Sequence, residues 1–121
     1  MLLRYKKAYE KIAMGLLSYM PGGKSVKKLQ ETMQFYETDE LSELFLLKDG
    51  EDFIGIIGIE LLDDAYIVRH LAVNPSYRGE GVGTEMVLQL KELYPALACR
   101  STEETEPFLR KCMCKEEEEA D

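Results

Sequence analysis

The sequence predicts one domain of the α/β (α+β) class, with a central mixed, mostly antiparallel sheet flanked by helices. Two observations favour it. Three apolar runs joined by tight turns indicate an antiparallel meander, and a strand, a glycine-rich turn and a helix follow one another over residues 66–94. A chain of 121 residues suffices for one core. We expect the domain to span residues 1–114 and an acidic, disordered tail to occupy residues 115–121.

A short strand and two helices are expected in the N-terminal third. Leu2 and Leu3 start the strand, and Pro21-Gly22-Gly23 ends the first helix. Ser25 is the expected N-cap of the second helix. Helical spacing indicates one apolar face on each helix. These faces are Tyr5, Tyr9, Ile12, Leu16 and Tyr19, with Ala8, Ala13 and Leu17 beside them, on the first helix, and Val26, Leu29, Met33 and Tyr36 on the second.

The meander is indicated by turn residues between apolar runs. Asp49-Gly50 between the runs at 44–48 and 53–60 is a strong hairpin signal. Gly55 and Gly58 are expected to mark a bulge or the close approach of another segment. After a helix at 84–94, the run at 96–100 predicts a fifth strand. A strand–helix–strand unit joins parallel strands, which makes the sheet mixed.

The turn after the strand at 66–73 has the features of a phosphate-binding loop. A helix start leaves backbone N–H groups without partners, and glycines at 79, 81 and 83 let a phosphate approach them. Arg78 adds charged donors. The dinucleotide pattern fails because Thr84 or Met86 stands at its last glycine position, and the P-loop fails because no Lys follows Gly83. The pattern favours a ligand site over a plain surface turn.

This string, Leu71-Ala72-Val73-Asn74-Pro75 followed by Arg78, Gly81 and Gly83, resembles motif A of the GNAT acetyltransferase superfamily. Element order is similar over residues 1–112. The resemblance implies the GNAT acyl-CoA N-acyltransferase fold, shortened at its C-terminus, and acetyl-CoA as the acyl donor. Within the superfamily, the chain is most similar to small acetyltransferase-like proteins encoded in riboflavin operons of Firmicutes, through features such as Arg4-Tyr5-Lys6-Lys7 and the Arg69-His70 pair.

The same resemblance implies roles for particular residues. The donor segment is Leu71, Ala72 and Val73, at the place where the fourth and fifth strands splay apart. The backbone of Leu71 and Val73 pairs with the pantetheine arm, and one of their N–H groups polarises the thioester carbonyl. The helices before the meander supply candidates for the acceptor wall, namely Tyr19, Met20, Phe35 and Tyr36. The loop expected around the pyrophosphate consists of Arg78, Gly79, Glu80, Gly81, Val82, Gly83 and Thr84.

The chain departs from the family pattern at catalytic positions. Leu109 stands where many members have the Tyr that protonates the departing thiolate, and Thr102 stands where they have Asn. Glu60 and His70 are the candidates for taking the proton of the attacking amine through water. Each also has a structural alternative, since Glu60 fits a surface carboxylate and His70 a packed, hydrogen-bonded ring. A thiolate with a pKa of about 8.5 can leave without an acid.

Two functions from different classes remain open. The first is an N-acetyltransferase in which an amine of an unidentified small molecule or protein attacks acetyl-CoA directly. The alternative is a non-catalytic acyl-CoA-binding or regulatory module associated with riboflavin metabolism. Because no counterpart of the last two GNAT strands is seen, we expect a homodimer that covers the exposed edge.

Composition limits the partners. The formal net charge of −8 argues against a nucleic-acid surface and suits cationic amines. No apolar run approaches the roughly 18 residues of a membrane helix, and no signal peptide is seen, so we expect a cytoplasmic protein without a membrane partner. The three cysteines are expected to be free thiols. Cys112-Met113-Cys114 lacks a second pair, and we expect no metal.

Overall fold

One five-stranded sheet forms the centre of the computed structural model, which describes residues 1–20 and 25–111. The strands follow one another across the sheet in chain order, and only the last pair is parallel. The mixed, mostly antiparallel sheet predicted from the sequence is therefore confirmed. The strands are β1 (Leu2–Arg4), β2 (Ser42–Asp49), β3 (Asp52–Leu61), β4 (Ala65–Val73) and β5 (Ala98–Ser101).

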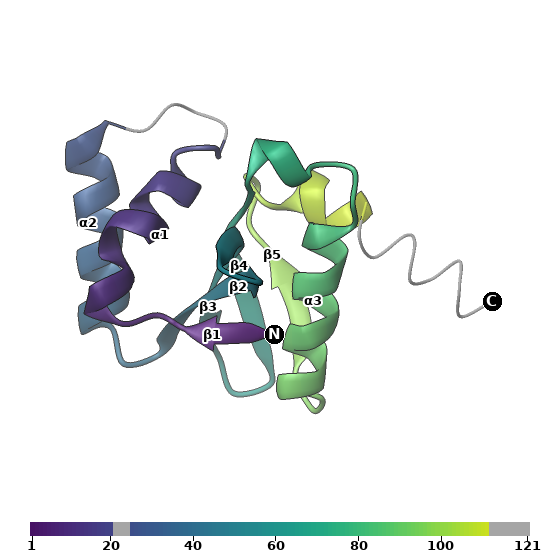
Figure 1. Cartoon of the computed structure of the whole chain (residues 1–121). Coiled ribbons are helices and arrows are strands. Elements are labelled where there is room, and N and C mark those ends of the chain that lie inside the picture. Colours follow the sequence, from purple (N-terminus) through teal and green to yellow (C-terminus); the bar gives the residue numbers. More distant parts are fainter. Residues whose placement is uncertain (21–24, 112–121) are drawn as a thin grey trace.

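Helices cover both faces of this sheet (Figure 1). The helices α1 (Glu10–Leu17) and α2 (Val26–Thr38) lie on one face, and α3 (Val82–Leu93) lies on the other, together with a helical turn at 106–111. Single 3-10 turns, η1 (Lys7–Tyr9) and η2 (Pro75–Tyr77), precede α1 and α3. Two apolar cores result, one on each side of the sheet. Because alternate strand residues enter opposite cores, β3 and β4 are apolar almost throughout.

Two glycines of β3 allow close packing on the two faces. A Cβ at Gly55 would lie 2.8 Å from the sulfur of Met86, which belongs to α3. A Cβ at Gly58 would overlap the hydroxyl oxygen of Tyr36, which belongs to α2. The predicted close approach is therefore confirmed at both positions. The hairpin is confirmed too, and its turn residue Gly50 has a φ of 62°.

The first helix is shorter than predicted. The N–H of Tyr5 donates to the carbonyl of Leu44 at 2.8 Å, which continues the sheet pairing of β1 and delays the helix. The predicted face of α1 is confirmed only in part: Ala13, Leu16 and Leu17 are buried, and Met20, just after the helix, is buried with them. Ile12 and Tyr19 are 38% and 42% exposed, so their predicted place on the buried face was wrong. The predicted end at Pro21-Gly22-Gly23 lies outside the described residues.

The second helix matches its prediction except at its first residue. The Ser25 side chain caps α2 by accepting from the N–H of Lys28 at 3.1 Å. The predicted buried stripe is confirmed from Leu29 through Met33 to Tyr36. Val26 was wrongly included, since it lies ahead of the stripe and is 65% exposed.

The C-terminal part of the fold follows the expected strand–helix–strand order. In the last helical turn Leu109 is buried, whereas its neighbour Phe108 is 40% exposed. Cys112 and the expected tail lie outside the described residues. Within the described ranges, no helix is long and apolar enough to span a membrane, and no three potential metal ligands lie together.

Candidate active site

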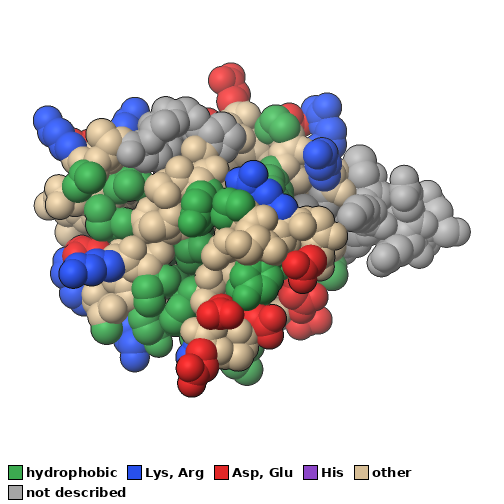
Figure 2. All heavy atoms as spheres, turned by 45° about the horizontal axis from the view of Figure 1, so that its top comes forward, with side chains coloured by type: hydrophobic (Ala, Val, Ile, Leu, Met, Phe, Trp, Pro, Cys, Tyr) green, Lys and Arg blue, Asp and Glu red, His purple; other side chains and the backbone are tan. Residues whose placement is uncertain are grey.

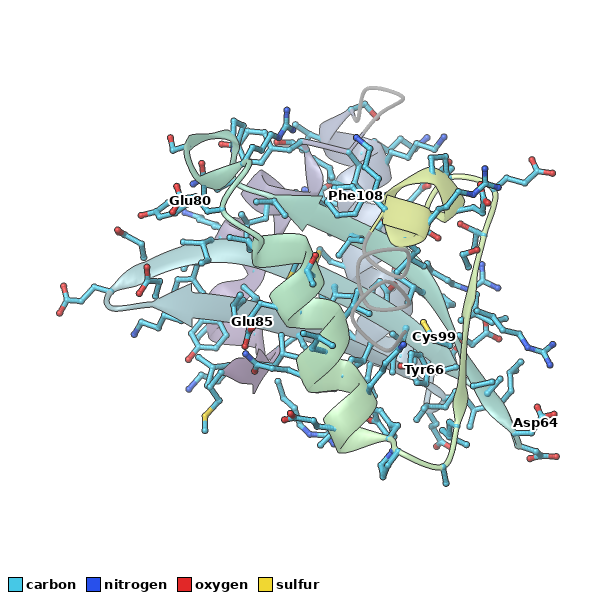
Figure 3. All side chains as sticks on the ribbon, turned by 90° about the vertical axis from the view of Figure 1, so that its right-hand side faces the viewer. Asp64, Tyr66, Glu80, Glu85, Cys99 and Phe108 are labelled. Atoms are coloured by element: carbon cyan, nitrogen blue, oxygen red, sulfur yellow. The ribbon has the colours of Figure 1, made fainter. Side chains whose placement is uncertain are left out.

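The strands β4 and β5 pair over only part of their length. β5 is in register with Ala65 to Val68, the last pair being Val68 with Ser101, and β4 then continues for five residues beyond β5. Figure 3 shows Tyr66 and Cys99 side by side where the two strands still pair. We call the place where they part, between Val68 and Ser101, the β4–β5 divergence.

A buried threonine holds this divergence in place. The hydroxyl of Thr105 donates to the carbonyl of Val68 at 2.7 Å, and Thr105 is 2% exposed. Its hydroxyl also accepts from the N–H of Thr102 at 3.0 Å, while the hydroxyl of Thr102 accepts from the N–H of Thr105. Reciprocal bonds of this kind start a helical turn, as in a capping box. The chain therefore turns away from β4 immediately after Ser101.

Beyond the divergence, ladder geometry sets the direction of the β4 backbone. The N–H of Asn74 donates to the carbonyl of Ile54 in β3 at 2.8 Å. Because hydrogen-bonded pairs alternate along an antiparallel ladder, Ala72 also bonds toward β3, while the N–H and C=O of Leu71 and Val73 point to the opposite side. The register shifts by one residue between Gly58 and Ile59, which leaves Arg69 as the bulged residue of β4.

The glycine loop adjoins this end of β4. Asn74 begins η2 by accepting from the N–H of Ser76, and the chain then passes through Arg78 and Gly79 to Gly81, the N-cap of α3. Gly79 and Gly81 have φ values of 84° and 79°, a region that L side chains rarely adopt. Gly81 offers no side-chain cap, so the first N–H groups of α3 have no capping side chain as acceptor.

All predicted loop residues therefore lie together at the start of α3. Arg78, Glu80 and Gly81 are exposed, whereas Val82 and Gly83 are buried in the first turn. Figure 3 shows Glu80 at this end of the helix, with Glu85 one turn further on. Figure 2, in which this end of the molecule comes forward, shows several acidic side chains gathered at the lower right, while other acidic side chains and the basic ones are spread over the rest of the face.

A hollow lies on the other side of the sheet, between α2 and β4. One part, of about 160 Å³, and an adjoining part, of about 280 Å³, share Lys28, Thr32 and His70 in their walls. Met20 and Glu104 line the first part, and Phe35 and Arg69 line the second. The predicted acceptor-wall residues Met20 and Phe35 thus line the hollow, while Tyr19 is absent from its walls.

Tyr36 and His70 meet beside this hollow. The Tyr36 hydroxyl lies 2.6 Å from Nδ1 of His70, and the two rings form an edge-on pair with centroids 5.3 Å apart. Gly58 makes this contact possible, because any side chain there would occupy the place of the hydroxyl. Burial raises the pKa of Tyr36 far above its ordinary value, while Arg69 lowers it and Glu60 raises it further.

Glu60 is joined to the same group of side chains by an ion pair. Its Oε1 lies 2.5 Å from Nε of Arg69, the bulge residue, and both side chains are partly exposed. This ion pair links the two predicted catalytic candidates, because Arg69, the partner of Glu60, directly precedes His70 in β4. Leu109, at the position of the family Tyr, is a core residue at 2% exposure.

Sequence reasoning missed several residues of this site. Lys28 and Thr32 line the hollow next to the buried stripe of α2, and their i, i+4 spacing with Phe35 one turn on was a usable signal. Glu104, which lines the first part of the hollow, was missed because it lies in a turn after β5 whose direction the sequence does not specify. Thr105 was also missed, although two threonines three residues apart at a helix start indicate reciprocal capping.

Comparisons with known proteins agree with this geometry. A model of the acetyltransferase (GNAT) family matches residues 10–110. An uncharacterized N-acetyltransferase in the lysA 3′ region of Bacillus methanolicus is 50% identical over 113 residues, covering 93% of this chain and 94% of that protein. The chain therefore belongs to the acetyltransferase (GNAT) family.

Solved structures confirm the fold. The apo structure of the aminoglycoside antibiotic 6′-N-acetyltransferase AAC(6′)-Ig from Acinetobacter haemolyticus is similar with a TM-score of 0.70 and 14% identity, covering 96% of this chain and 88% of that one. AAC(6′)-Iy in complex with CoA is similar with a TM-score of 0.72 and 12% identity, covering 95% and 84%. The predicted GNAT fold is confirmed.

Proposed function

We propose that this protein is an acetyl-CoA-dependent N-acetyltransferase that transfers the acetyl group to an amine by direct attack. The observation that supports this most is the pair of outward-facing backbone sites at Leu71 and Val73, beside a glycine loop that opens the first turn of α3. An extended arm can add to such a strand edge, and a pyrophosphate can bind such a helix start. AAC(6′)-Iy, of similar fold, was solved with CoA.

Each part of the site has a role in this proposal. When bound, the thioester supplies the activated acetyl group. The N–H of Leu71 or Val73 donates to the carbonyl oxygen and favours the negative charge that develops there. Residues 78–84 hold the pyrophosphate, chiefly through main-chain N–H groups, and Arg78 adds charge. The hollow beside α2 holds the amine, whose proton leaves through water toward Glu60 or His70.

A second candidate function is supported by Leu109. A leucine side chain has no acidic proton, and this one is buried in the core, so Leu109 cannot protonate a leaving thiolate. A non-catalytic acyl-CoA-binding or regulatory module, with the link to riboflavin metabolism implied by the likeness to the RibT proteins of riboflavin operons, fits this feature. Under this alternative the same loop binds CoA but no transfer follows.

The two candidates differ in one measurement. Thiol release from acetyl-CoA is followed with a panel of small amines and with amine-bearing peptides, with amine-free reactions as the blank. Release above the blank with any acceptor supports the transferase. Tight CoA binding with no release across the panel supports the binding module, and absence of CoA binding defeats both.

We also propose a homodimer that covers the outer edge of β5. In the described part of the chain β5 is the last strand of the sheet, and Ala98, Arg100 and Ser101 are exposed there. Unpaired strand edges favour pairing with another chain. Sedimentation over a range of concentrations tests this, because a species that stays monomeric at the highest concentration removes the proposal.

A further inference from the structure

The hydrogen bond between Tyr36 and His70 has a direction that decides what His70 can do. A neutral imidazole has one N–H and one lone pair, so the partner of Nδ1 determines the chemistry of Nε2. Tyr36 lies on α2 and is 7% exposed, and His70 lies on β4 in the walls of both parts of the hollow.

Two observations make the hydroxyl the donor. Within residues 1–20 and 25–111, Nδ1 of His70 is the hydrogen-bond partner of the Tyr36 hydroxyl, at 2.6 Å. If the ring donated instead, the buried hydroxyl hydrogen would face no acceptor, which costs more than an unused lone pair. The distance also matches bonds donated by O–H, which are shorter than those donated by N–H. Because burial raises its pKa, Tyr36 keeps this hydrogen.

We propose that Tyr36 is a positioning residue that donates to Nδ1 of His70 and thereby fixes the neutral ring in the tautomer with its hydrogen on Nε2. In this tautomer the single lone pair of the ring is already engaged, so resting His70 does not take the proton of an attacking amine. Nε2 then carries the hydrogen of the ring, and the proton route of the proposed reaction passes to Glu60.

The same hollow also bears on the acceptor, a step that rests on the proposed transferase function. The second part of the hollow is lined by Lys28 and Arg69, which carry positive charge, and by His70, and one carboxylate, that of Glu31, lies among them. The side chains of Lys28 and Arg69 suit an oxygen that accepts hydrogen bonds, and the carboxylate of Glu31 suits the ammonium form of the amine. The acceptor class is therefore an amine that also carries a carboxylate, carbonyl or hydroxyl oxygen.

The chain offers a direct test because His70 is its only histidine. The tag-free protein is labelled with ¹⁵N-histidine, and long-range ¹H–¹⁵N correlations are recorded at a pH where the ring is neutral. We expect one set of signals, with Nδ1 unprotonated and Nε2 protonated. A protonated Nδ1 in the wild-type protein would overturn the proposal.

Two variants test the role of Tyr36 itself. Tyr36→Phe keeps the ring and removes the donor, so the Nδ1 signal is expected to move downfield and a minor Nδ1–H form to appear. Gly58→Ala displaces the hydroxyl from the other side and is expected to produce the same change. The matched control is Tyr77→Phe, which removes an exposed hydroxyl that donates to Asp52. Spectra of both variants identical to the wild type would refute the role of Tyr36.

The failure of this inference is distinguishable from failure of the proposed function. The tautomer is read in the free protein, without CoA, and thermal melting of the same samples verifies folding. If the transferase is established, Lys28→Met is expected to raise the KM for an oxygen-bearing amine more than it lowers kcat. An equal loss with amines that lack the oxygen would refute the acceptor class while leaving CoA binding intact.

Discussion

Replacing Gly81 with Val separates the strain of the glycine loop from its proposed contact with a ligand. Gly81 has a φ of 79°, and no heavy atom lies within 4 Å of a Cβ built there. The substitution therefore costs only backbone strain, about 1–2 kcal/mol, and its side chain stands in the open space before α3. A lost N–H bond to a charged phosphate oxygen is worth about 1.5–3 kcal/mol, so CoA affinity should fall roughly 10- to 150-fold.

The chain contains a matched control for this experiment. Gly50, in the β2–β3 hairpin, has a φ of 62° and equally open space. Gly50→Val should lower the free energy of unfolding by a similar amount and leave CoA affinity unchanged. Stability is measured by urea denaturation and affinity by titration calorimetry. If both variants bind CoA as the wild type does, or if both lose affinity equally, the proposed role of the loop is refuted.

Two further substitutions test the framework of the site, and a third tests a contact at the surface. Thr105→Val leaves the carbonyl of Val68 without its buried donor, and should lower the free energy of unfolding in urea by about 1–3 kcal/mol; a loss near zero would show that the bond does not hold the divergence. Gly58→Ala forces a Cβ against Tyr36 and should cost about 1–3 kcal/mol of overpacking, and an unchanged melting temperature would contradict that packing. Glu37→Gln tests a surface contact, because the Tyr5 hydroxyl and then Lys7 lower the pKa of Glu37 below its ordinary 4.5. The variant should be less stable at pH 7 by about 0.2–1 kcal/mol, and the difference should vanish as the pH falls through the lowered pKa; a difference that persists in acid would assign it to packing.

The order of elements could be predicted from sequence because each signal is local. Asp49-Gly50 specifies a hairpin, Ser25 a helix start, and the glycines after Pro75 a strand-to-helix turn, whatever the rest of the chain does. The parallel pairing of β5 followed from chain connectivity alone. The sequence alone therefore suffices to place Leu71 to Val73, the segment proposed to pair with acetyl-CoA, at the end of β4 and the glycine loop at the start of α3.

The details of the acceptor side could not be predicted, because they depend on distant segments. Nothing near Gly58 in sequence indicates that Tyr36 fills the missing Cβ position, or that His70 lies one strand away. The width of the buried face of α1 was also misjudged, since a helix of two turns leaves few residues from which to define its edge, and Ile12 was wrongly included beside Ala13, Leu16 and Leu17.

The central claim is that backbone N–H groups of β4 and of the α3 start hold a CoA thioester. Amide ¹H–¹⁵N spectra of the protein titrated with CoA test it most directly. The account predicts the largest shifts at Leu71, Val73 and residues 79–84, with the β2–β3 turn at Gly50 unaffected. Saturable shifts confined to other residues, or no shifts at all, would contradict it.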